Sequence, residues 1–189
     1  APKEPSAATI WNTTSTAQKK SGPNTSDCWK GKMIESFAPI YDKNCRVLIL
    51  GSCPSVQSLA KGEYYGNRQN RFWRVMFRLL GEEYSDDYSV KTGMLLRHGV
   101  ALWDTIGSCA RQGSLDSAIK DVRPNDVAAL IRDGGVRCVA LNGGKAKAVF
   151  RQKVDADVVF LPSTSPANAR MDFETLFSVW QKTLSPYLY

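Results

Sequence analysis

A cluster of aromatic, amide and basic side chains follows the first long apolar run of the chain, VLIL at 47–50. The chain leaves this run through GSCPS at 51–55, and YYGNRQNRFW at 64–73 then interleaves aromatic rings with amides and arginines. An aromatic face can stack on a planar ligand, an amide donates and accepts hydrogen bonds, and arginine binds phosphate. The candidate residues of this segment are Gly51, Ser52, Cys53, Tyr65, Arg68, Asn70 and Arg71.

Three further apolar runs also end in polar residues. They are GVALWDT at 99–105, VRCVALNG at 136–143 and DVVFLPS at 157–163, and together with RVLILGS at 46–52 they are nearly continuous stretches of aliphatic side chains. Runs of this kind predict strands that are buried on both faces, as in a parallel sheet. Ligands bind beyond the carboxyl ends of such strands, which is where GSCPS, WDTIGS, NGGKA and LPSTSP lie.

Amphipathic segments alternate with these runs. NRFWRVMFRLLG at 70–81 places Phe72, Val75, Met76 and Leu79 on one stripe, and PNDVAALIRDGG at 124–135 begins with capping residues and stops at paired glycines. Strand and helix therefore alternate. The sequence predicts an α/β fold of three layers, αβα, with helices on both sides of a central four-stranded parallel sheet.

Composition limits the class of protein. The 189 residues are 43% hydrophobic and 23% charged, and no apolar run approaches the roughly 20 residues that span a bilayer. The net charge of +7, with a pI near 9.2, favours polyanionic partners. Five cysteines without a CxxC pair indicate free thiols in a reducing, intracellular compartment, and no metal site.

Residues 1–28 differ in composition from the rest of the chain. They are rich in Ala, Ser, Thr, Pro and Lys and have no sustained apolar period, which predicts an extended or disordered arm before a domain at 29–189. The Ser, Thr and Lys bias is also compatible with the remnant of an organellar presequence, so we expect a mitochondrial or nuclear location. Ile10 and Trp11 could anchor such an arm on a partner.

The motifs at the strand ends resemble those of the uracil-DNA glycosylase superfamily. The order GSCPS, Ser58-Leu59, YYGNRQNRFW, ALWDTIGSC, LNGGKA and LPSTSPANAR is most similar to the hypoxanthine (deoxyinosine) DNA glycosylase branch. The first motif of that branch runs GS-x-P-G, SL, YYAHP-x-N-x-FW, and its last reads LPSTSPA. The resemblance covers about residues 45–181, and it implies the same fold, a flipped base as ligand and no cofactor.

The resemblance also implies roles for single residues. Tyr65 would stack on the base, within a pocket bounded by Gly51, Ser52 and Cys53. Asn70 would orient the attacking water or hold the base, and Asp104 would accept a hydrogen bond from the N–H of hypoxanthine or uracil. The hydroxyls and backbone N–H groups of 163–165 would serve a phosphate or the departing base. In that loop Ser163 is expected to serve catalysis. The residues expected to bind nucleic acid are Ser165, Asn168, Arg170, Arg68 and Arg71.

Structural roles are open for the same residues. Tyr65 could be a core aromatic, Asn70 a helix N-cap and Asp104 a cap at a strand end, and the arginines after residue 67 could line a solvated helix face. The sequence also departs from the family pattern. Asn67-Arg68 replaces the family's His-Pro, and Ser55 stands where the family has glycine.

Two functions from different classes follow. The first is a monofunctional DNA glycosylase that excises deaminated bases, hypoxanthine or uracil, from DNA. The alternative is a glycosylase fold that has lost its activity and acts as a structural subunit of a large nucleoprotein assembly, such as a mitochondrial ribosome. In that case residues 1–28 would contact RNA and protein subunits.

Overall fold

The computed structural model describes residues 32–111, 117, 119–132 and 134–189. At its centre lies a four-stranded sheet with the strand order β3-β2-β6-β7, in which all neighbours are parallel. The two central strands are buried along their whole length. The four predicted strands are confirmed, and their bounds are Val47–Gly51 for β2, Val100–Asp104 for β3, Cys138–Asn142 for β6 and Asp157–Leu161 for β7. The expectation that each strand is buried on both faces is wrong for β7, because it lies at the edge of the sheet and exposes Val158 and Phe160.

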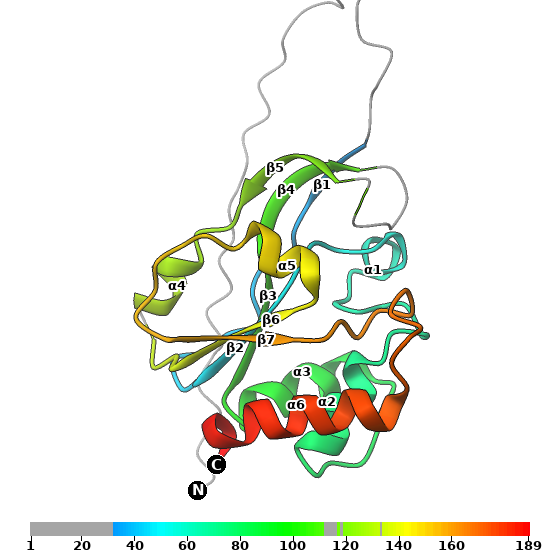
Figure 1. The fold of residues 1–189 in the computed structure, drawn as a ribbon, viewed down its shortest axis with the longest axis vertical. Coiled ribbons are helices and arrows are strands. Elements are labelled where there is room, and N and C mark those ends of the chain that lie inside the picture. The colour runs from blue at the N-terminus through cyan, green and yellow to red at the C-terminus, as the bar shows by residue number, and fades with distance from the viewer. Residues whose placement is uncertain (1–31, 112–116, 118, 133) are drawn as a thin grey trace, which may run out of the picture.

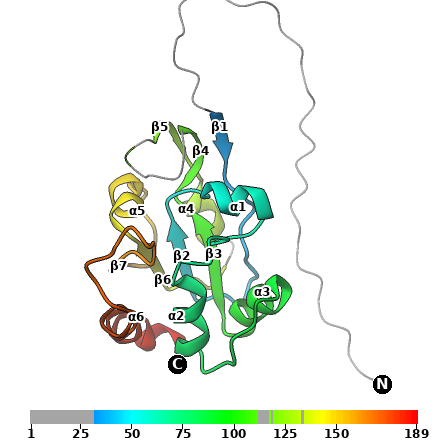
Figure 2. The same cartoon turned by 90° about the vertical axis from the view of Figure 1, so that its right-hand side faces the viewer.

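Helices cover both faces of this sheet (Figures 1 and 2). Val47 and Ile49 of β2 belong to the core beneath one helical layer, while Leu48 and Leu50 face the other layer, so side chains alternate between two cores. The first layer holds α2 (Phe72–Leu79), α3 (Tyr88–Arg97) and α6 (Phe173–Leu188), and the second holds α4 (Val127–Arg132) and α5 (Gly144–Val149). The predicted three-layer αβα class is confirmed.

The two helices that flank the strand ends are fixed by ordinary local signals. Six of the eight side chains of α2 are buried, and the chain turns away at Gly81, whose φ of 68° favours glycine. The N-cap of α6 is Asp172, whose side chain accepts a hydrogen bond from the Thr175 N–H. Trp180, fully buried on α6, donates from Nε1 to the Pro162 carbonyl at 3.0 Å. This bond fastens the loop after β7 to the helical layer.

A second sheet was not predicted from the sequence. It is antiparallel and three-stranded, has the order β1-β4-β5, and lies beyond the end of β3 in Figure 1. Every residue of β5 is exposed and β4 reads IGSCAR, so neither strand has an apolar run or a clear alternation. The bounds are Lys32–Glu35 for β1, Ile106–Arg111 for β4 and Lys120–Pro124 for β5, and a short helix α1 spans Val56–Lys61.

The predicted arm at 1–28, with its anchor residues Ile10 and Trp11, falls outside the described residues. The boundary at residue 29 therefore stays a prediction. Among the helices of the described part, α6 is the longest at 16 residues, and none combines the length and apolar character needed to cross a membrane.

Candidate active site at the strand ends

The register of the parallel sheet brings three polar strand ends to one edge. Gly51 pairs with Asp104 across β2 and β3, and Leu50 pairs with Leu141, so the next residue of β6, Asn142, lies at the same level. Asp104 and Asn142 are both buried, with 4% and 8% of their surfaces exposed. An acceptor and an amide therefore flank Gly51 at the edge where α/β proteins bind ligands.

Gly51 forms the floor of the candidate site, between the Asp104 carboxylate and the Tyr65 hydroxyl. A Cβ atom at this position would lie 2.6 Å from Asp104 Oδ1 and 3.1 Å from the hydroxyl of Tyr65. The Gly51 carbonyl accepts hydrogen bonds from Thr105, at 2.9 Å from the backbone N–H and at 3.0 Å from Oγ1. The backbone is thus held in place, and only a residue without a side chain lets both polar groups approach it.

Tyr65 lies half-buried over this floor. Its ring stacks on Phe72 with centroids 4.0 Å apart and an interplanar angle of 18°, and its hydroxyl accepts a hydrogen bond from Asn142 Nδ2 at 2.9 Å. Its φ of 52° is in the left-handed region, which costs a bulky residue about 1–3 kcal/mol. Since one face of the ring is occupied by Phe72, a ligand that stacks on Tyr65 has to use the opposite face.

The neighbouring tyrosine has the opposite environment. Tyr64 is buried, its hydroxyl donates toward the Phe37 and Ala38 carbonyls, and its own carbonyl accepts from Trp73 Nε1 at 3.0 Å. Burial raises the pKa of Tyr64, and the Asp104 carboxylate raises it further. The pair therefore splits into one structural ring and one ring at the site.

Asn70 lies at the start of α2 and has a structural role there. Its Oδ1 accepts a hydrogen bond from the N–H of Phe72, the first residue of α2, at 3.0 Å. The N-cap position itself is Arg71, so Asn70 caps this N–H from one residue earlier in the chain. Because the acceptor oxygen is engaged by an N–H donor, the amide Nδ2 is the group of Asn70 that can serve a ligand. The catalytic role stays a prediction.

The loop at 162–172 is organised by its own backbone. Thr164 is fully buried, and its N–H and Oγ1 both bond to Asn142, at 3.1 Å each. The N–H of Ser165 donates to Ser163 Oγ at 3.2 Å, and Asn168 Nδ2 donates to the Ser163 carbonyl at 3.0 Å. The backbone N–H groups of 164 and 165 are thus used within the fold, so the hydroxyls of Ser163 and Ser165 are the donors left for a ligand.

Arg71 holds this loop against the start of α2. Its guanidinium donates to the carbonyls of Met171 at 2.5 Å, Asn168 at 3.0 Å and Ser165 at 3.3 Å, with longer bonds of 3.5 Å to Ser163 and Thr164. The Arg71 N–H also donates to the Thr164 carbonyl at 3.0 Å. A guanidinium that fans out over five carbonyls positions the loop, so its contribution to nucleic-acid binding would be indirect.

We expect Arg71→Met to lower the free energy of unfolding by about 2–3 kcal/mol, because several carbonyls lose a charged donor at once. For a chain of this size the melting temperature should fall by roughly 5–10 °C. Arg71→Lys should recover only part of this loss, since an ammonium group cannot reach five acceptors. Thermal unfolding of Arg74→Met, an exposed neighbour on α2, is the control; equal melting temperatures for the Arg71 and Arg74 methionine variants would contradict the role.

The Cys53 thiol lies behind the floor. Its Sγ accepts a hydrogen bond from Arg111 Nη1 at 2.9 Å and is 3.8 Å from Cys109 Sγ. Burial raises the pKa of Cys53 strongly, although the Arg111 charge opposes this shift. The thiol therefore stays protonated at neutral pH and is a wall of the site and not a base.

Some functional residues were not singled out from the sequence. Asn142 links the loops of Tyr65 and Thr164, buried Arg111 donates to Cys53 and to the Pro54 carbonyl, and Asn125 Nδ2 donates to the Asp104 carbonyl at 2.9 Å. A signal existed for Asn142, which ends a predicted strand. The exposed predicted residues, Arg68 and Arg170, lie on the two loops outside this network.

A model of the uracil DNA glycosylase superfamily matches residues 38–184. The chain belongs to the uracil DNA glycosylase superfamily. The matched range contains every strand end of the parallel sheet, both loops and all of the predicted site residues, so the geometry above is that of a superfamily member.

Two curated relatives and one solved structure come from archaea. A hypoxanthine DNA glycosylase of Methanosarcina acetivorans is 37% identical over 138 residues, which cover 71% of this chain and 87% of the relative. A hypoxanthine DNA glycosylase of Methanosarcina barkeri is 33% identical over 142 residues, with 72% and 89% covered. A solution NMR structure from M. acetivorans, given as a candidate uracil DNA glycosylase, has a TM-score of 0.71, 32% identity and coverage of 84% of this chain and 100% of its own.

Proposed function

We propose that the protein is a monofunctional DNA glycosylase that flips a deaminated base, hypoxanthine or uracil, out of DNA and hydrolyses its N-glycosidic bond. The observation that carries this proposal is the buried Asp104 carboxylate, which shares the floor at Gly51 with the ring of Tyr65. A base enters such a site as a flat ring with a polar edge. The names of the two curated relatives support hypoxanthine as a substrate.

The carboxylate accounts for the choice of deaminated bases. An ionised carboxylate only accepts hydrogen bonds, so it pairs with the N1–H of hypoxanthine or the N3–H of uracil. Adenine has a bare N1 and would meet the carboxylate oxygen with a lone pair. Tyr65 fixes the plane of the base by stacking, because its ring is held by Phe72 and its hydroxyl by Asn142. Stacking on Tyr65 and the hydrogen bond to Asp104 together define one orientation of the base.

Hydrolysis breaks the bond between the sugar C1′ and the base nitrogen. The electron pair leaves with the base as an anion and the sugar becomes a cation. Water then adds to C1′, and the proton that it loses neutralises the base anion. Asn70 Nδ2 is a donor that can hold the water oxygen or the carbonyl of the departing base. The hydroxyl of Ser163 is a second donor toward the developing negative charge. Neither group needs to ionise, and the reaction consumes only water.

The strand around the flipped nucleotide needs anchoring outside this pocket. Asn168 and Arg170 on the loop at 162–172, together with Arg68 on the loop before α2, are the predicted contacts with phosphate or the groove. Ser165 keeps a hydroxyl donor after its N–H has bonded to Ser163. Arg71 supports these contacts by holding the loop that carries three of them.

The test is release of free base from oligonucleotides with a single hypoxanthine or uracil, measured under single-turnover conditions in parent and Asp104→Asn. An asparagine adds a donor to the acceptor, so we expect the ratio of the two rates to change by about 10–100-fold, or roughly 1–3 kcal/mol. A uniform loss of both activities with a lower melting temperature would make Asp104 structural. No release by the folded parent from either substrate would overturn the proposed function.

The alternative of a structural subunit without activity depends on residues 1–28, which fall outside the described residues. A mitochondrial or nuclear location and contacts with RNA or protein subunits depend on the same segment. The two curated relatives, in contrast, are named as DNA glycosylases of archaea. These names favour the enzymatic function over a structural subunit.

A further inference from the structure

An open groove of about 640 Å³ lies beside the loops of the site, along α2 and the start of α6. The residues that matter in its lining are Arg68, Arg74, Arg78, Tyr84 and Phe173. We call this surface the arginine groove. It is separate from the strand ends, but it begins where both site loops finish: Arg68 is two residues from Asn70, and Phe173 follows the loop at 162–172.

The arginine groove presents positive charge that its own acids do not neutralise. Of the two acids in the lining, Glu82 is bonded to Arg97 at 3.0 Å and to His98 at 2.9 Å, while Asp86 lies 3.8 Å from Lys91 Nζ and accepts a hydrogen bond from the Tyr84 hydroxyl at 3.0 Å. Arg78 is paired with Glu174 at 2.7 Å. Arg68 and Arg74, in contrast, form no ion pair with any acidic residue in the described part of the chain. Both are exposed, so two guanidinium groups remain for an anionic ligand.

Aromatic faces accompany these charges. The guanidinium of Arg74 lies 4.5 Å from the centroid of the Phe173 ring, which orients the arginine in the groove. Tyr84 is 49% exposed, although it packs against buried Phe77 with ring centroids 5.2 Å apart. Burial raises the pKa of Tyr84, the hydrogen bond from its hydroxyl to Asp86 at 3.0 Å raises it further, and the charges of Arg68 and Arg74 in the same groove lower it.

Arginines beside an exposed ring match one ligand chemistry, an unpaired nucleic-acid strand. Phosphates bind guanidinium groups, and an unstacked base binds an aromatic face, worth about 1–3 kcal/mol for each base. A duplex offers the phosphates but keeps its base faces stacked. The continuity of the groove with both site loops gives a strand that leaves the pocket a direct path into it.

We propose that the arginine groove binds an unpaired nucleotide of the substrate strand next to the flipped one, with its phosphate at Arg68 and Arg74 and its base against Tyr84. This inference rests on the proposed function, because the strand enters the groove from the glycosylase site. It predicts that the protein binds single-stranded DNA more tightly than blunt duplex DNA of equal length, through residues that do not touch the excised base.

The experiment measures the dissociation constant of the full chain for undamaged oligothymidylate by fluorescence anisotropy at several salt concentrations. Arg74→Gln should raise Kd about 10-fold and lower the slope of log Kd against log salt by about 0.7, because one phosphate contact is lost. Tyr84→Leu should raise Kd about 5-fold or more with an unchanged slope, because stacking releases no counterion. Melting curves of both variants check that they fold.

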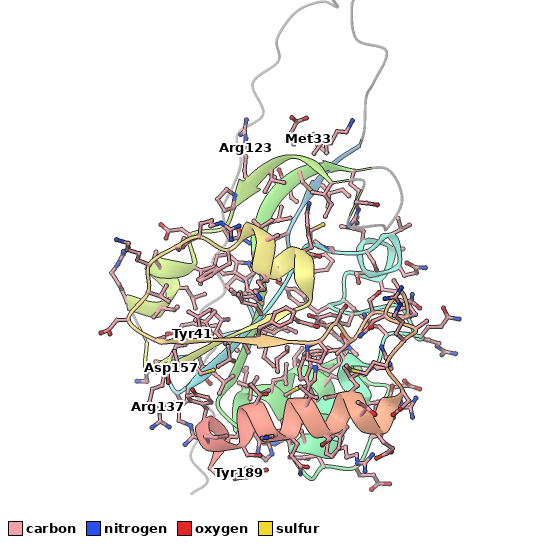
Figure 3. All side chains as sticks on the ribbon, viewed as in Figure 1. Met33, Tyr41, Arg123, Arg137, Asp157 and Tyr189 are labelled. Atoms are coloured by element: carbon pink, nitrogen blue, oxygen red, sulfur yellow. The ribbon has the colours of Figure 1, made fainter. Side chains whose placement is uncertain are left out.

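Arg137→Gln is the matched control for charge. Arg137 is exposed and precedes β6, and Figure 3 labels it beside Asp157 at the opposite end of the sheet. From Phe173 the whole of α6, about 24 Å long at 1.5 Å per residue, separates the two ends. The control should keep the parental Kd. Equal effects of Arg74→Gln and Arg137→Gln, or parental binding by Tyr84→Leu, would overturn the groove.

Two further measurements separate the outcomes. If Tyr84→Leu weakens binding to a blunt duplex as much as to the single strand, the proposal that the groove binds an unpaired nucleotide is wrong. Base release by the parent, combined with single-strand binding that ignores Arg74 and Tyr84, overturns the groove alone. Binding that depends on both residues in a parent that releases no base supports strand binding and overturns the glycosylase.

Discussion

Asn70→Ala should lower the single-turnover release of hypoxanthine or uracil by about 10²-fold or more, while most of the stability is retained. The size is that of losing a positioned donor at the reacting centre, about 2.7 kcal/mol. The alanine also removes the cap of α2, because Asn70 Oδ1 accepts from the Phe72 N–H, and a lost cap costs about 1 kcal/mol of stability. Rate and stability must therefore be measured together.

Asn70→Asp separates the two roles. Aspartate keeps an oxygen that accepts from the Phe72 N–H, so the melting temperature should stay at the parental value. It lacks the amide donors, so base release should fall about as far as in the alanine variant. Parental rates in Asn70→Asp would show that the Nδ2 group does no chemistry, and parental rates in both variants would remove Asn70 from the site.

Gly51→Ala should also reduce base release by about 10²-fold, through a steric effect on the carboxylate. The added Cβ would lie 2.6 Å from Asp104 Oδ1 and 3.1 Å from the Tyr65 hydroxyl, so the side chains must move apart. The backbone cannot yield easily, since Thr105 binds the Gly51 carbonyl twice. A carboxylate displaced by even 1 Å no longer meets the base edge, and misplacement of this size costs about two orders of magnitude.

Gly144→Ala is the control for Gly51→Ala. It is the same substitution at the first residue of α5, where an added Cβ would have no atom within 4 Å. We expect parental rates and an unchanged or slightly higher melting temperature, because alanine favours a helix over glycine. If Gly51→Ala releases base as fast as this control, the carboxylate does not contact the base from its position over Gly51.

The sheet could be predicted because each of its strands carries its own signal. RVLILGS, GVALWDT, VRCVALNG and DVVFLPS are apolar runs typical of strands in a parallel sheet, and the observed strands lie inside them. The edge strand β7 has such a run although Val158 and Phe160 are exposed. The antiparallel sheet carries no such signal. KDVRP in β5 is exposed throughout and forms a strand because β4 offers it hydrogen bonds, not because of its own side chains.

The candidate site shows the same division. Gly51 and Asp104 could be placed at the same edge from the sequence, since both end predicted strands and parallel strands end at one edge. That their strands are neighbours is seen only in the structure. The role of Arg71 could not be predicted from the sequence, because its acceptors are backbone carbonyls, which every residue type has. Asn142 likewise bonds to Tyr65 and Thr164, which are 77 and 22 residues away, so only the folded chain shows its function.

The bonds between Arg71 and the loop at 162–172 have a consequence during biosynthesis. These bonds span 92 to 100 residues, and Trp180 secures the same loop from α6. Contacts between such distant parts form late, because the chain between them must first be made and closed into a loop. A nascent polypeptide would therefore carry Gly51, Tyr65 and Asp104 long before it carried the loop that Arg71 and Trp180 hold. Chains released from the ribosome before α6 is made should therefore be unable to act on DNA.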